Sequence, residues 1–189
     1  MIKNFITLAA LAAASAPALA ISFEGAITQG GTVVSNYAST GLISFDIDFA
    51  NTAPATLDYR VDADDLNMPL ALNSLLRNLS GSGIDGYAIQ LSAGSFAQTG
   101  SLTRQFGGST VVTVLGGLAT FSFSPPEYLD VEVGNALGTT PGALNWTLAG
   151  LQAGDRISLT VSAVPEPGTH ALWLAGLGLV GWIARRRAA

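Results

Sequence analysis

The sequence contains no cysteine, and its only lysine and only histidine, Lys3 and His170, lie close to its two ends. Without cysteine there is no disulfide framework, no thiol nucleophile and no thiolate metal site, so the core must be held together by packing. Residues 21–164 also lack histidine and lysine, so no familiar general base is present to activate a serine. These absences argue against catalysis, and we expect that the protein is not an enzyme.

Positive charge is scarce in the middle of the chain. Residues 21–164 hold four arginines and no lysine against twelve acidic residues, a formal excess of eight negative charges. Such a surface repels phosphate backbones, so we expect no nucleic-acid partner. Acidity of this kind favours solubility but specifies no binding partner.

Much of the hydrophobic content lies in two short runs near the ends of the chain. The first, Phe5 to Ala14, follows Lys3 and leads to the small residues Ala18 and Ala20. A positive start, a short apolar core and a small-x-small ending form the pattern of a secretory signal peptide. We predict a signal peptide over residues 1–20 that signal peptidase cleaves after Ala20, which places the following residues outside the cytoplasm.

The second hydrophobic run lies at the C-terminus, after Val164-Pro165-Glu166-Pro167. The two prolines favour an extended, accessible segment, because each fixes φ and removes an amide donor. The uncharged residues 171–184 predict a transmembrane helix, and Arg185-Arg186-Arg187 predicts its cytoplasmic stop. Fourteen residues at about 1.5 Å each give roughly 21 Å, short of the ~30 Å hydrocarbon core. We therefore expect a marginal inner-membrane anchor that is suited to being temporary.

Together, the proline-glutamate-proline triplet, the short apolar segment and the arginine cluster resemble the PEP-CTERM sorting signal over about residues 164–187. The resemblance implies recognition by an exosortase, a membrane-embedded transpeptidase-like enzyme of Gram-negative bacteria. Val164, Pro165, Glu166 and Pro167 would be the sorting motif. The resemblance also implies a surface or extracellular-matrix protein associated with exopolysaccharide and biofilm. Such a protein would face the periplasm as a membrane intermediate before it reaches the cell surface.

The middle of the chain, residues 21–163, shows short segments in which apolar and polar residues alternate. Leu42 to Phe49 is the clearest case, since every second residue from Ile43 is a large apolar one. About ten such segments separated by Gly, Ser, Asn and Pro turns predict an all-β, antiparallel sandwich or jelly roll. The predicted strands are Ile21–Glu24, Thr32–Val34, Leu42–Phe49, Thr56–Val61, Tyr87–Leu91, Thr110–Leu115, Leu118–Phe123, Leu129–Val133, Asn145–Leu148 and Arg156–Ala163.

One stretch departs from this period. Leu72, Leu75, Leu76 and Leu79 fall at helical spacing, and Gly81 can close a helix. We therefore predict a short helix from Pro69 to Ser80.

Acidic residues cluster around Asp62, Asp64 and Asp65, with Asp58 close by. Calcium requires several oxygen ligands on a flexible loop, so Asp62, Asp64 and Asp65 form a candidate calcium site. The spacing does not fit an EF-hand loop, and an ordinary solvated acidic loop remains the alternative.

Two further readings of the middle segment remain open. Glycoside hydrolysis needs two carboxylates, which Glu127, Asp130 and Glu132 offer without a pattern that picks the acid or the base. Trp146 can form a sugar-stacking platform or, as is commoner for a lone tryptophan in a strand, belong to the core. Two alternatives to a non-catalytic surface protein thus remain. One is a carbohydrate-binding or hydrolytic module that is exported through the same C-terminal tail. The other is a plain periplasmic protein anchored by its C-terminal helix.

Overall fold

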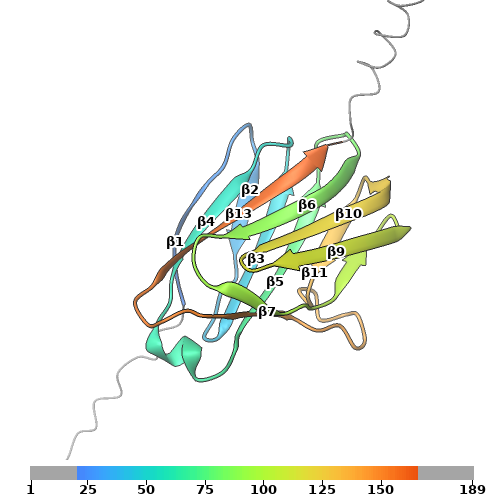
Figure 1. Ribbon diagram of the computed structural model, residues 1–189. Coiled ribbons are helices and arrows are strands. Elements are labelled where there is room, and N and C mark those ends of the chain that lie inside the picture. The colour runs from blue at the N-terminus through green and yellow to red at the C-terminus, as the bar shows by residue number, and fades with distance from the viewer. Residues whose placement is uncertain (1–20, 166–189) are drawn as a thin grey trace, which may run out of the picture.

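The computed structural model describes residues 21–165, and two β-sheets packed face to face account for nearly all of their regular structure (Figure 1). The first sheet is antiparallel throughout, in the spatial order β1 (Ser22–Ile27), β4 (Ala55–Arg60), β13 (Arg156–Pro165), β6 (Ile84–Leu91), β10 (Leu118–Glu127) and β9 (Ser109–Leu115). The second has the order β2 (Val33–Asn36), β3 (Leu42–Phe49), β5 (Leu70–Asn78), β11 (Asp130–Val133) and β8 (Leu102–Arg104). In that sheet β12 (Trp146–Ala149) pairs with β5 beyond β11, and β7 (Ser95–Gln98) pairs with β12. No helix within residues 21–165 is long and apolar enough to cross a membrane.

The core lies between the two sheets and follows from the period-2 alternation of the strands. In β3 the side chains of Ile43, Phe45, Ile47 and Phe49 are fully buried, while the residues between them are only partly so. Across the core, β4 contributes Leu57 and Tyr59 in the same alternating way, as the pleat of a strand requires. The prediction of an all-β sandwich is confirmed.

Each of the ten predicted strands overlaps an observed one, and Leu42–Phe49 coincides with β3. One feature differs from the expected antiparallel arrangement: β3 and β5 run parallel, with Leu42 opposite Ala71 and Phe49 opposite Asn78. Strands β7 and β8 were not predicted, because with four and three residues they are too short to show a clear alternation of apolar and polar residues.

The predicted helix from Pro69 to Ser80 is wrong, because this segment contains the central strand β5. β5 has β3 on one side and β11 and β12 on the other, so its backbone hydrogen bonds are made within the sheet. A strand covered on both faces carries a nearly continuous apolar run, whose spacing cannot be distinguished from that of a buried helix. The one helix in residues 21–165 is instead the four-residue 3-10 helix η1 (Ala63–Leu66).

A second correction concerns the C-terminal boundary of the sandwich. Val164 and Pro165 were expected to lie in an extended segment outside the domain, but they form the end of β13, where Val164 pairs with Gly86 and Pro165 with Ile84. The register shifts between these two pairs, which is the irregularity at which a strand tolerates proline. The sandwich therefore extends at least to Pro165, two residues beyond the predicted boundary at Ala163.

Candidate functional site

The two ends of the sandwich differ in charge. We call the end at which β13 finishes the tail end and the opposite end, which carries η1, the far end (Figure 1). The strand registers place five loops at the tail end: 28–32, 50–54, 79–83, 105–108 and 128–129. None of these loops contains a charged residue. The far-end loops 61–69 and 150–155 hold four aspartates.

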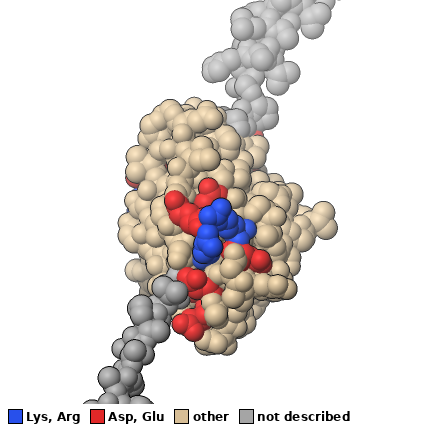
Figure 2. Space-filling model, turned by 90° about the vertical axis from the view of Figure 1, so that its left-hand side faces the viewer, with Lys and Arg blue, Asp and Glu red and all other residues tan. Residues whose placement is uncertain are grey.

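The arginines of the sandwich are all engaged in ion pairs. Glu24 contacts both Arg60 and Arg156 through N–O distances of 3.0 and 3.1 Å. Figure 2 shows one side of the molecule, on which basic atoms form a single group among acidic ones and the upper end is almost wholly uncharged. The four arginines of residues 21–165 are each paired with a carboxylate, so the sandwich presents no free basic patch for a polyanion within those residues.

On the outer face of the second sheet, Arg77 of β5 lies between two carboxylates of β3. Its guanidinium donates to Asp48 at 2.7 Å and to Asp46 at 3.0 Å. The hydrogen bond to Asp48 is the largest of the contributions that raise the pKa of Arg77 above its usual value. Asp46 and Asp48 thus share one cation, the Arg77 guanidinium.

The candidate hydrolytic carboxylates are occupied with structural contacts. Glu127 is fully buried and accepts a hydrogen bond from Arg104 Nε at 3.0 Å, and its other oxygen accepts backbone N–H groups of the adjoining loops. Glu132 is buried as well and accepts hydrogen bonds from the Leu137 N–H and the Thr140 hydroxyl. An acid and base for glycoside hydrolysis must reach substrate, which these two side chains do not.

Asp130 is the third of these carboxylates and is only partly buried. Desolvation raises the pKa of Asp130, and the nearby Arg77 opposes that effect. Burial likewise raises the pKa of Tyr59 and Tyr87 well above the ordinary phenol value, so neither phenol ionises near neutral pH. These groups show no arrangement of an acid beside a base.

The three aspartates of the candidate calcium site are not brought together as ligands. Asp65 is fully buried, and its two oxygens accept backbone N–H groups of Ile21, Gly41 and Asp62 at 2.9–3.0 Å. Asp64 is exposed, and the Asp62 carboxylate accepts a hydrogen bond from Ser22 Oγ. Residues 21–165 contain no group of three or more acidic or histidine side chains placed to hold a metal ion. The oxygens of Asp65 hold backbone segments together and are not available to a metal ion.

Trp146 is fully buried in the core, which excludes its role as an exposed sugar platform. Its ring makes edge-on contacts with Phe96 and Phe121, at centroid distances of 5.6 and 5.5 Å, and its Nε1–H donates to the Ser101 carbonyl. The commoner of the two readings of this residue, a core tryptophan, is confirmed.

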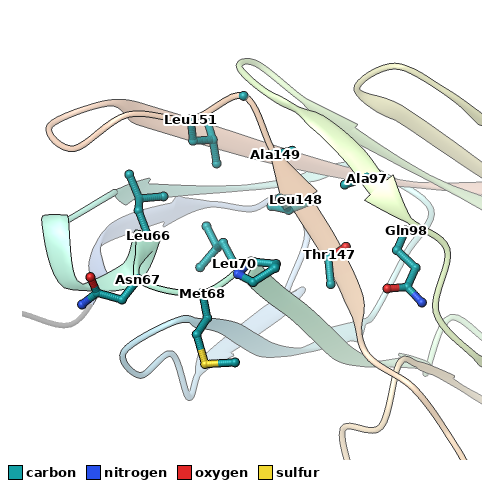
Figure 3. A pocket seen from close by; sticks show the side chains of 12 residues that line it. Leu66, Asn67, Met68, Leu70, Ala97, Gln98, Thr147, Leu148, Ala149 and Leu151 are labelled. Carbon is teal, nitrogen blue, oxygen red and sulfur yellow. The ribbon is translucent and has the colours of Figure 1, made fainter.

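An open hollow of about 580 Å³ lies beside η1 at the far end (Figure 3). Figure 3 shows Met68 and Leu66 on one side of it and Gln98 and Thr147 on the other, with Leu70 and Leu148 between them. Its walls are mainly aliphatic, and none of the lining residues is ionisable. The hollow therefore supplies no acid, base or nucleophile strong enough for catalysis.

Comparison with known proteins identifies the tail. Residues 163–187 match the family model described as the PEP-CTERM protein-sorting motif. No curated protein and no solved structure matches the chain. The chain thus carries a PEP-CTERM motif, which implies export, processing by an exosortase and sorting to the cell surface.

Of the four residues of the predicted sorting motif, the structure describes Val164 and Pro165, which form the end of β13. The signal peptide with Ala18 and Ala20, Glu166, Pro167, the segment 171–184 and the cluster Arg185, Arg186 and Arg187 lie outside the described residues.

The sequence reading did not find the contacts of Asp65 and Glu127. One feature of the sequence pointed to an ion pair: Arg104 is one of only four arginines among twelve acidic residues in this part of the chain. The partner of a buried carboxylate nevertheless depends on strand order, which the sequence pattern did not reveal.

Proposed function

We propose that this chain, which carries a PEP-CTERM motif, is a non-catalytic surface or extracellular-matrix protein whose β-sandwich is exported and then released by processing of its tail. The observation that carries the proposal is the match of residues 163–187, which begins in the last three residues of the last strand. The strands described in residues 21–165 all precede Glu166, so cleavage after the motif leaves each of these strands whole. Signal peptidase removes the leader, and the released domain is located among exopolysaccharide outside the cell.

The structure supports a non-catalytic role by how it uses its ionisable side chains. Buried carboxylates hold loops, arginines pair with carboxylates, and the far-end hollow has aliphatic walls. The hydrolytic alternative needs accessible carboxylates, and the sugar-binding alternative needs an exposed ring where Trp146 is buried. The remaining alternative is a protein anchored permanently by its C-terminal segment. That alternative predicts that the mature protein keeps its tail.

Replacing the three residues Pro165, Glu166 and Pro167 together by alanine tests the sorting step. We expect the variant to accumulate in the membrane fraction with its tail intact and to disappear from the outside of the cell, because the exosortase no longer recognises it. The measurement is immunodetection of membrane, surface and medium fractions. The matched control is Thr169→Ala with His170→Ala, which alters the same tail outside the triplet. External protein at the wild-type level from the triple variant would contradict the proposal.

The charge difference between the two ends fits an anchored intermediate. Residues 166–170 separate the end of β13 from the apolar segment, and five residues span at most about 18 Å. The tail end therefore stays within about 18 Å of the apolar segment while the tail remains attached. Its loops lack charge and expose Leu79 and Leu129, whereas the loops that hold the four far-end aspartates lie at the opposite end of the sandwich.

Because the chain has no cysteine, single fluorescent labels can be placed to test this orientation. Leu79→Cys and Leu129→Cys mark the tail end at positions 62% and 51% exposed, and Met68→Cys and Leu115→Cys mark the far end at positions 75% and 79% exposed. For the full chain in phospholipid vesicles we expect aqueous iodide to quench the far-end labels strongly and the tail-end labels weakly. Equal quenching at both ends would rule out the orientation.

A further inference from the structure

The buried carboxylate of Asp65 joins three separate segments at the far end. Its Oδ1 accepts hydrogen bonds from the Ile21 N–H at 3.0 Å and the Gly41 N–H at 2.9 Å. Its Oδ2 accepts the Asp62 N–H at 2.9 Å. The ion pairs formed within residues 21–165 do not include Asp65, although its side chain is inaccessible to solvent. A buried carboxylate with hydrogen bonds but no counter-ion is costly, because it has lost its hydration.

One of the three donors has a special position in the sequence. Ile21 is itself buried, at 4% exposure, and it is the residue that follows the predicted cleavage point at Ala20. Hydrolysis of the Ala20–Ile21 peptide bond adds water: the acyl carbon takes the hydroxyl and the nitrogen takes the proton. The new amine binds a further proton near neutral pH, as α-amino groups do.

We propose that the α-ammonium group formed at Ile21 when the leader is removed is the buried counter-ion of Asp65. The nitrogen that donates to Asp65 is the same atom before and after cleavage, so no rearrangement of the chain is needed. Cleavage converts a neutral amide donor into a charged one, and charge-assisted hydrogen bonds are roughly twice as strong as neutral ones. Removal of the leader therefore strengthens the Ile21–Asp65 contact at the far end. This contact, together with the other hydrogen bonds of Asp65, fixes β1, the turn at Gly41 and η1 to one another.

This inference rests on the signal-peptide part of the proposed function and is independent of how the tail is processed. It links maturation to stability: the precursor folds into a less stable sandwich than the mature chain. A leader that delays final stabilisation suits a chain that must cross a membrane before it folds.

The composition of the chain provides a selective test. Its only lysine, Lys3, belongs to the leader, so the mature chain has one primary amine, the α-amino group of Ile21. An amine-acetylating ester therefore modifies a single site, which intact mass reports. We expect acetylation of the folded mature chain to be about tenfold slower or more than in urea, the factor that corresponds to one charged hydrogen bond. Asp64→Asn, in the same loop, should keep this protection, and Asp65→Asn should lose it.

A second measurement does not depend on the folding of any variant. Acetylation in urea followed by refolding restores an amide N–H at Ile21 without the charge, as in the precursor. We expect the acetylated wild-type chain to unfold at a lower urea concentration than the unmodified chain, by far-UV circular dichroism. Equal acetylation rates in the folded and unfolded chain, or equal unfolding midpoints, would overturn the ion pair and leave the tail-sorting proposal standing. A mature mass that does not begin at Ile21 would overturn the inference together with the predicted leader cleavage, again without bearing on the tail.

Discussion

Glu127→Ala is expected to lower the free energy of unfolding by about 3–5 kcal/mol, the range measured when one partner of a buried ion pair is removed. The side chains of Glu127 and Arg104 are 0% and 3% exposed, so the charge left on Arg104 cannot be hydrated. The substitution also leaves the N–H groups of Phe106 and Leu129 without their carboxylate acceptor. A domain of this size has a total stability of about 5–15 kcal/mol, so this loss is a large fraction of it.

Urea unfolding followed by far-UV circular dichroism measures this loss. The control is Glu24→Ala, which removes the shared partner of Arg60 and Arg156 on the surface and should cost no more than about 1 kcal/mol per pair, because solvent screens exposed ion pairs. Replacing both partners, as in Arg104→Met with Glu127→Leu, should recover part of the stability lost in Glu127→Ala. If Glu127→Ala and Glu24→Ala cost the same, the buried pair does not hold the tail end together.

Trp146→Ala is expected to be comparably destabilising, at about 3–5 kcal/mol, because a large buried aromatic leaves a cavity that its neighbours fill only in part. The indole packs edge-on against Phe96 and Phe121, one from each sheet, and its N–H is bonded to the Ser101 carbonyl. The chain approaches the ring closely at Gly100, where an added Cβ would lie 2.5 Å from the indole Cδ1. Trp146 thus connects β12, the opposite sheet and the loop between β7 and β8.

The comparison variant is Phe106→Ala, which removes an exposed ring that contacts Tyr128 at the tail end. We expect Phe106→Ala to change the urea midpoint only slightly. A Trp146→Ala protein with wild-type stability but altered retention on a polysaccharide column would restore the sugar-platform reading and contradict the core assignment.

Alternation predicted strands such as β3 and β4 well because one face of each is buried. In β3 the buried residues Ile43, Phe45 and Ile47 occur at every second position, and the predicted and observed bounds agree. The same reasoning failed at β5, where the outward-facing Leu75 is buried as well, so apolar residues occupy both faces and the period is lost. Strand order, and with it the parallel pairing of β3 and β5, depends on contacts between distant segments that a local pattern does not report.

The acidic residues show the same limit. Asp62, Asp64 and Asp65 look alike in the sequence, yet Asp65 is buried under three backbone donors and Asp64 is exposed. The difference arises because the N-terminal segment and the turn at Gly41 come together over η1. The tail could be read from its sequence because a sorting signal is a local pattern, and the family match covers the same residues.

The intact mass of the protein recovered from outside the cell tests the central claim, export followed by removal of the tail, most directly. We predict a chain that begins at Ile21 and ends near Pro167, within a few residues of the end of β13. The membrane-bound precursor should then retain the remainder of the tail. External protein that still carries Arg185, Arg186 and Arg187 would contradict the claim and would favour a permanent C-terminal anchor.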